Sequence, residues 1–158
     1  MLLESLTNAF GQILLTVQLV LFLILLTAVS VWDISERKIP DGLQIGIAAL
    51  SLLQFRPQNI LGILTAFPYL AVALCCQNEK GIGGGDVKLA GALGLVLGLS
   101  TGLAASMVGL AGFVLYGMGI QVYQRGRKNV KQAPLPLGPF LAVGAAVIYF
   151  MEVGGMIL

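Results

Sequence analysis

Residues 11–32 read GQILLTVQLVLFLILLTAVSVW, and none of these 22 residues is charged. As a helix that rises about 1.5 Å per residue, such a stretch is long enough to cross a hydrocarbon core of about 30 Å. The stretch therefore predicts a membrane-spanning helix. A polar segment, DISERKIPDG at residues 33–42, follows directly, and we expect the helix to end where that segment begins.

The composition of the whole chain agrees with a membrane protein. Hydrophobic residues make up 58% of the 158 residues and charged residues only 10%, with a mean hydropathy of +0.95. A soluble domain carries about a quarter charged residues, so the surface of this protein must face lipid. No basic run is long enough to indicate a nucleic-acid partner. The chain has no histidine, which excludes histidine-activated nucleophiles and histidine-ligated metals.

Polar turns divide the rest of the chain into further apolar spans. Three of them cover residues 43–55, 59–76 and 137–158, and Pro68 predicts a kink in the second. The charge-free run at 89–123 has 35 residues, too many for one span. We divide it at residues 98–102, where glycine, serine and threonine favour a turn. The prediction is an all-α bundle of about six transmembrane helices.

The basic residues predict how this bundle is oriented. With six spans, the turns at residues 33–42, 77–88 and 124–136 lie on one side of the membrane. They hold eight of the nine lysines and arginines, and Arg56 is the exception. Loops rich in lysine and arginine stay in the cytoplasm. We therefore expect these three turns to be cytoplasmic and both ends of the chain to lie outside the cytoplasm.

Two aspartates stand out among the seven acidic residues. Asp33 and Asp86 each lie where a predicted span meets a cytoplasmic turn, so both face the same side of the membrane. Ionisable residues near membrane depth often mark functional sites. Simpler interpretations remain open, because Asp33 could be an interfacial anchor and Asp86 the N-cap residue of the next helix.

A glycine-rich segment, GIGGG at residues 81–85, precedes Asp86. Without side chains, this backbone allows another chain to approach closely, and an extended substrate could pair with it as an added strand. A phosphate-binding loop is excluded, because no Lys-Ser or Lys-Thr pair follows the glycines. A dinucleotide-binding fold would need a soluble βαβ unit, which this sequence does not supply.

Two neighbouring aspartates can perform hydrolysis without a metal or a cofactor. Like charges a few ångströms apart do not both ionise, so the pair shares one proton. One carboxylate then takes a proton from water while the protonated partner polarises the scissile carbonyl. Two other functions stay open on this reasoning. The aspartates could form the ion or proton relay of a small transporter, or the chain could be a scaffold whose glycines serve helix packing.

Three motifs resemble those of the prepilin peptidases, also called type IV leader peptidases. DISERKIPD at residues 33–41 resembles their first catalytic motif, and GIGGGDVKL at 81–89 resembles the second. The core of the second, residues 83–86, is the signature of the Gly-x-Gly-Asp membrane aspartic proteases. PLPLGPF at 134–140 is similar to the Pro-x-Gly-Pro-Phe segment that opens the family's last helix. The motifs occur in the family's order.

The resemblance implies a function and its site. Asp33 and Asp86 would be the catalytic pair of an endopeptidase that removes the basic leader of pilin-like precursors at the cytoplasmic face of the bacterial inner membrane. Large members also methylate the new N-terminus, using a cytoplasmic insertion that often carries Cys-x-x-Cys motifs. This chain has only the adjacent Cys75 and Cys76 and no such insertion, so we expect the short form without methylation.

The resemblance also indicates residues that bind substrate or support the catalytic pair. It implies a single integral membrane peptidase domain over residues 1–158, and we expect no metal and no cofactor. The expected partners are a pilin-like precursor and the lipid bilayer, and the oligomeric state stays open. Lys88 could act on a nearby carboxylate or contact a lipid phosphate. The prolines are expected to shape the start of the last helix. The supporting residues are Gly83, Gly84, Gly85, Lys88, Pro136, Gly138 and Pro139.

Overall fold

The protein is an all-α bundle, as the sequence predicts. The computed structural model describes residues 2–75, 83–124 and 135–155, and every regular element within these ranges is a helix. The elements are α1 (Leu2–Glu36), α2 (Asp41–Leu50), the 3₁₀ helix η1 (Pro57–Thr65), α3 (Ala66–Cys75), α4 (Gly84–Leu97), α5 (Leu99–Gln124) and α6 (Gly138–Val153).

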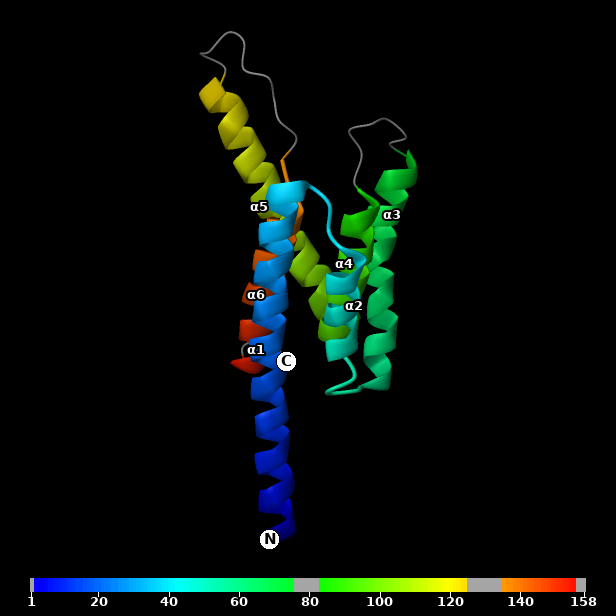
Figure 1. Ribbon diagram of the computed structural model, residues 1–158, viewed down its shortest axis with the longest axis vertical. Coiled ribbons are helices and arrows are strands. Elements are labelled where there is room, and N and C mark those ends of the chain that lie inside the picture. Colours follow the sequence, from blue (N-terminus) through cyan, green and yellow to red (C-terminus); the bar gives the residue numbers. More distant parts are fainter. Residues whose placement is uncertain (1, 76–82, 125–134, 156–158) are drawn as a thin grey trace.

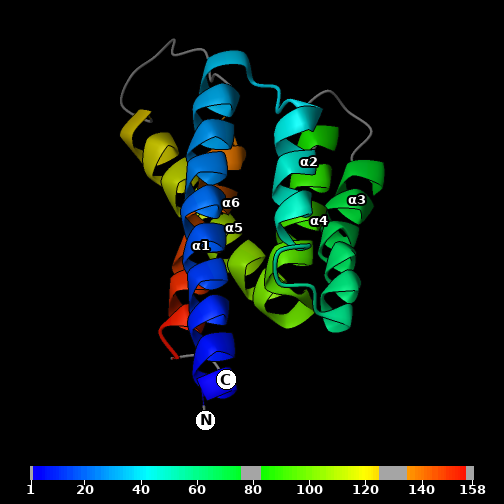
Figure 2. The same cartoon turned by 60° about the horizontal axis from the view of Figure 1, so that its bottom comes forward.

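The helices form two groups that meet along the middle of the bundle. Helices α1 and α6 lie side by side in one group, and α2, η1, α3 and α4 make up the other (Figures 1 and 2). Helix α5 starts beside α4 and runs obliquely to the α1–α6 group. The end of α1 and the starts of α2, α4 and α6 all lie toward one end of the molecule, where the sequence motifs meet.

Three segments are long and apolar enough to cross a membrane by length and composition: Glu4–Glu36, Pro57–Cys75 and Leu99–Tyr123. Helices α2 and α6 are apolar but shorter, with 10 and 16 residues, and α4 has 14. Six α-helices are thus present in the described residues, while only three segments have the length of a complete span. Short helices are tolerated where neighbouring protein covers their ends.

The first helix is longer at both ends than the predicted span. It covers 35 residues and ends at Glu36, so Asp33 lies inside its last turn. Helix α1 stops where Arg37 adopts a positive φ of 55°, while the Arg37 backbone N–H donates to the Asp33 carbonyl at 3.0 Å. The predicted polar turn at 33–42 is therefore wrong in its bounds, because a hydrophilic residue does not by itself end a helix. The connecting segment is only residues 37–40.

The chain changes helix type just before Pro68, where the sequence predicts a kink. The chain is a 3₁₀ helix through Thr65 and an α-helix from Ala66 onward. Pro68 consequently lies in the first turn of α3, where a missing backbone N–H costs little. The predicted division of the long apolar run is confirmed. Gly98, with a φ of 85°, separates α4 from α5.

Glycines let the helices cross closely, as expected for a membrane bundle. Gly62 of η1 lies against Gly94 of α4, and a Cβ added at either would overlap the other's carbonyl oxygen. Gly109 of α5 and Gly144 of α6 form a second crossing, where a Cβ at Gly109 would lie 2.8 Å from the carbonyl oxygen of Phe140. These two crossings fix how α4 packs on η1 and how α6 packs on α5.

Candidate active site

Asp33 is buried at the junction of α1 and α6. Its side chain is 6% exposed, although it lies only one turn from the end of α1. The backbone N–H of Gly138, the first residue of α6, donates to Asp33 Oδ2 at 2.8 Å. A helix N-terminus carries partial positive charge and unpaired N–H groups, so it is a favourable neighbour for a carboxylate. The start of α6 therefore holds Asp33 in place.

Glycine at position 138 leaves room for the Asp33 side chain. A Cβ there would lie 2.7 Å from Asp33 Oδ2 and 3.0 Å from its Cγ, so the carboxyl group would have to move. Pro139 follows in the first turn of α6, where proline is tolerated, and Pro136 is half-buried before the helix. The third motif thus reaches the site through Gly138, which contacts Asp33 directly.

The glycine-rich segment positions Asp86 at the start of α4. Gly83 is the N-cap residue, and its carbonyl accepts the Asp86 backbone N–H at 3.0 Å. Asp86 is the third residue of the helix, so the alternative interpretation of it as an N-cap aspartate is wrong. Gly84 has open space where a Cβ would be, and Gly83 and Gly84 are exposed. Residues 81 and 82 of the motif lie outside the described residues.

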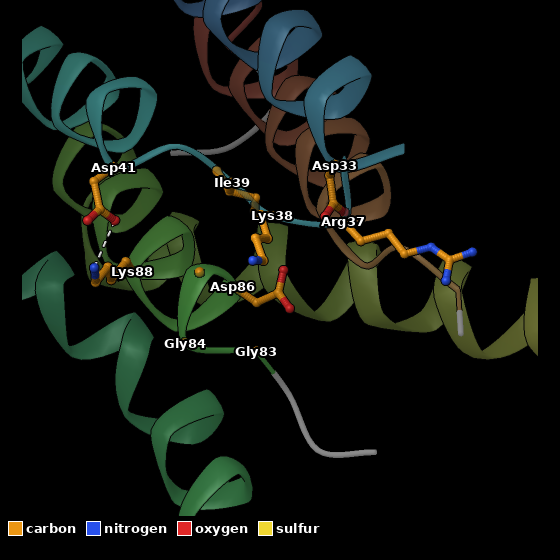
Figure 3. Close-up of a pocket in the computed structure, with 10 residues that line it drawn as sticks. Asp33, Arg37, Lys38, Ile39, Asp41, Gly83, Gly84, Asp86 and Lys88 are labelled. Carbon is orange, nitrogen blue, oxygen red and sulfur yellow. Dashed lines mark hydrogen bonds and ion pairs between the residues drawn. The ribbon is translucent and has the colours of Figure 1, made fainter. Parts of the chain in front are cut away.

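The two aspartates line one pocket of about 320 Å³ between the two groups of helices. Figure 3 shows both carboxyl groups directed into the space between the end of α1 and the start of α4. Six of the nine residues predicted from the sequence line this pocket, while Gly138 lies behind Asp33 and the two prolines are not part of the lining. The lining residues are Asp33, Arg37, Lys38, Ile39, Asp41, Gly83, Gly84, Gly85, Asp86 and Lys88.

The two carboxyl groups in the pocket have different electrostatic surroundings. Asp86 lies outside the three candidate spans. Burial raises the pKa of Asp86 to about 6, the negative charge of Asp33 raises it as well, and a backbone hydrogen bond with Gly83 partly opposes this. A carboxyl group with such a pKa holds a proton at mildly acidic pH, while Asp33 accepts a backbone N–H. The pocket therefore brings together two carboxyl groups with different surroundings, and burial favours the protonated form of Asp86.

The cations around the pocket have different surroundings. Lys88 pairs with Asp41 at 2.8 Å, and both side chains are largely exposed, so the pair adds only about 0–1 kcal/mol to stability. The carboxylate that Lys88 contacts is therefore Asp41 rather than Asp33 or Asp86. Figure 3 shows Lys38 extending toward Asp86, whereas Arg37 points away from both aspartates.

Gln44 of α2 is a site residue that the sequence analysis missed. It is 4% exposed, and its Nε2 donates to the carbonyl of Gly85 at 3.1 Å and, at a longer 3.5 Å, to that of Ile39. The signal for it is weak, because it is simply a polar residue in the apolar run at 43–55. Within the described ranges, no group of three or more potential metal ligands occurs.

The comparisons with known proteins agree with the first two motifs. The model of the type IV leader peptidase family matches residues 20–126, about two thirds of the chain and both aspartates. A prepilin leader peptidase/N-methyltransferase of Bacillus subtilis (strain 168) is 32% identical over 137 residues, covering 82% of this chain and 54% of the relative. One of Burkholderia pseudomallei (strain 1026b) is 41% identical over 91 residues, covering 58% of this chain and 28% of the relative.

These relatives are longer than the chain, which spans about half the length of the Bacillus protein and less of the Burkholderia protein. The comparison with solved structures gave no significant match. The family match nevertheless covers most of the chain, and it includes the two segments that carry Asp33 and Asp86 into one pocket. On this evidence, the chain belongs to the type IV leader peptidase family.

Proposed function

We propose that this membrane protein is an aspartic endopeptidase that cleaves the basic leader from pilin-like precursors at the cytoplasmic face of the membrane. The observation that carries the proposal is the shared pocket of Asp33 and Asp86, in a member of a leader peptidase family. The names of the two relatives point to prepilin leaders as the substrate class.

In the proposed mechanism, Asp86 carries the shared proton and Asp33 is the base. The Gly138 N–H holds Asp33 as an acceptor, while burial and the neighbouring charge favour the protonated form of Asp86. Asp33 takes a proton from water as the water attacks the scissile carbonyl, and Asp86 donates a hydrogen bond to the developing oxyanion. As the tetrahedral intermediate collapses, the scissile C–N bond breaks and Asp33 gives its proton to the leaving amine, which regenerates the pair.

The glycines provide a path for an extended substrate beside the pair. Gly83 and Gly84 are exposed and carry no side chain, so a peptide can approach their backbone closely. In strand addition, main-chain hydrogen bonds give affinity without demanding a fixed side-chain sequence. We propose that the residues flanking the cleaved bond bind here while the precursor's apolar helix stays in the bilayer.

We also propose that the chain lacks the methylation activity named for its relatives. No long polar insertion lies between Asp33 and Asp86, and the only cysteines are Cys75 and Cys76. The basic turns favour an orientation in the inner membrane with both ends outside the cytoplasm. We further propose that residues 1–158 form one peptidase domain. Incubating purified protein with precursor and a labelled methyl donor is expected to give cleaved but unmethylated product. Label incorporation into the mature pilin would contradict this.

The test of the function is cleavage of candidate pilin precursors co-expressed with the wild-type chain. The expected result is a mobility shift, with mass spectrometry locating the new N-terminus at the junction of the basic leader and the apolar helix. A panel of precursors from the same genome covers the choice of substrate. If none of them is cleaved by protein that is folded and inserted in the membrane, the peptidase proposal is wrong.

The pH dependence of cleavage follows from the pKa of Asp86. The productive pair holds one proton, and with a pKa of about 6 Asp86 loses that proton as the pH rises through 6. We expect kcat/KM, which reports free-enzyme pKa values, to fall about tenfold per pH unit above this point. Initial rates in detergent between pH 5 and 8 would measure this, with thermal unfolding at each pH as the control. A flat profile would contradict the assignment.

Gly138→Ala is expected to lower kcat about 100-fold, because the added Cβ displaces Asp33, and a shift of about 1 Å in a catalytic group has effects of this size. The fold and KM are expected to change little. Gly46→Ala is the matched control, since its Cβ would make only an ordinary 3.6 Å contact with Leu25. Equal rates for the two variants would show that Gly138 does not position Asp33.

A further inference from the structure

Gln44 joins the two segments that carry the catalytic motifs. From α2, its side-chain amide reaches the carbonyl of Gly85, the residue directly before Asp86, and the carbonyl of Ile39 in the segment that follows α1. Both acceptors are backbone groups, so the bonds fix the main chain. The two motifs are far apart in sequence, and Gly85 lies 41 positions after Gln44.

The orientation of this amide is determined by its neighbours. Both groups facing it are carbonyl oxygens, which only accept hydrogen bonds, so the NH₂ end must point toward them. The other end, Gln44 Oε1, is buried and has no hydrogen-bond partner among the described residues. A buried acceptor without a partner lowers stability. A leucine of similar volume would avoid that penalty, so core packing alone does not account for a glutamine here.

The packing around Gly85 makes the arrangement sensitive to Gln44. Gly85 faces this amide and Ile39, since a Cβ there would make ordinary contacts of 3.7 Å with Gln44 Nε2 and 3.6 Å with Ile39 Cβ. The start of α4 therefore rests on the segment after α1 through Gln44. A displacement of this contact moves Asp86 relative to Asp33, which is held separately by Gly138.

We propose that Gln44 is a positioning residue that holds the start of α4 against residues 39–40 and so sets where Asp86 lies in the pocket. The proposal rests on the proposed peptidase function and adds a residue to its machinery. Gln44 does not line the pocket, so its effect on cleavage is exerted through the Gly85 carbonyl.

The first test replaces the amide with an apolar side chain of similar size. Gln44→Leu is expected to lower kcat by as much as about 100-fold with little change in KM or in the unfolding midpoint. Gln18→Leu is the matched control, because Gln18 is also 4% exposed but lies about four turns from Asp33 on α1. Equal kcat values for the two variants would overturn the proposal, as would a loss in Gln44→Leu that a lower unfolding midpoint fully explains.

Gln44→Glu provides a readout that a purely structural role would not change. A protonated glutamic acid can donate one hydrogen bond to the Gly85 carbonyl, whereas the ionised form repels it. We expect the kcat of Gln44→Glu relative to Gln44→Leu to rise as the pH falls. The charged groups that line the neighbouring pocket are the same in both variants: Asp33, Arg37, Lys38, Asp41, Asp86 and Lys88. A ratio independent of pH would contradict the proposal.

A third measurement does not depend on cleavage. Hydrogen exchange in detergent should be faster at the start of α4 in Gln44→Leu than in wild type, and unchanged in Gln18→Leu. If wild type cleaves no precursor, the peptidase proposal fails while the exchange experiment still decides whether Gln44 holds α4. Unchanged exchange in Gln44→Leu would overturn the positioning role even if wild type cleaves normally.

Discussion

Asp33→Asn and Asp86→Asn are each expected to abolish detectable leader cleavage, with kcat falling by up to about 10⁴-fold. An amide can neither take a proton from water nor carry the shared proton, and general acid–base catalysis by one group contributes about 10²–10⁴-fold. The two groups act as a unit, because the proton belongs to the pair. The double variant is therefore expected to be no slower than either single variant.

Glu36→Gln is the matched control for both substitutions. It removes a carboxylate only three residues from Asp33, on an exposed side chain at the end of α1 that does not line the pocket. Cleavage is measured by mobility shift at equal membrane levels, and unfolding midpoints confirm that each variant is folded. Cleavage that survives either aspartate substitution would exclude the aspartic mechanism. Wild-type rates in Glu36→Gln are the expected result for the control.

The same variants discriminate between the three functions that the sequence leaves open. In an ion or proton relay, the aspartate substitutions would abolish ion flux. In a scaffold, they would change its function little. Only a peptidase loses cleavage of a pilin-like precursor. Asp33 and Asp86 lie at one end of the bundle, where they line a pocket at the ends of helices. Such a location suits a protein substrate that approaches along the membrane face.

The sequence predicts the helices better than their ends. Hydropathy reports where apolar residues are, so it predicts the run at 11–32 but does not detect that α1 continues through Asp33 to Glu36. That extension matters, because it places Asp33 within a rigid turn beside α6. The break at Gly98 was predictable because a charge-free run of 35 residues exceeds one span. The 3₁₀ geometry of η1 has no comparable pattern in the sequence.

The site was predictable where its residues have unusual chemistry. Asp33 and Asp86 are carboxylates at the ends of apolar spans, and the glycines beside Asp86 are conspicuous. Gln44 and the pair of Asp41 with Lys88 were not predictable, because ordinary polar residues acquire partners only in the folded chain. Gly138 lay within a recognised motif, yet its contact with Asp33 requires knowledge of how α6 packs on α1.

The packing of α4 on η1 predicts the largest change in stability. Gly94→Ala is expected to lower the free energy of unfolding by about 3 kcal/mol, at the upper end of the range for overpacked cores. Its Cβ would overlap the Gly62 carbonyl oxygen and the Thr65 hydroxyl, and a backbone carbonyl cannot turn aside as a flexible side chain would. Thr65 is itself fixed by hydrogen bonds to the carbonyls of Gly62 and Ala90.

The measurement is unfolding in detergent, followed by helical circular dichroism. Gly119→Ala is the control, because α5 has open space at that position and alanine favours a helix over glycine by about 1 kcal/mol. Gly62→Ala disturbs the same contact from the other side. The double variant Gly62→Ala/Gly94→Ala is therefore expected to lower the free energy of unfolding by less than the sum of the two single changes. Equal free energies of unfolding for Gly94→Ala and Gly119→Ala would mean that η1 and α4 can move apart without lowering the stability. The position of Asp86, in the first turn of α4, would then not depend on that crossing.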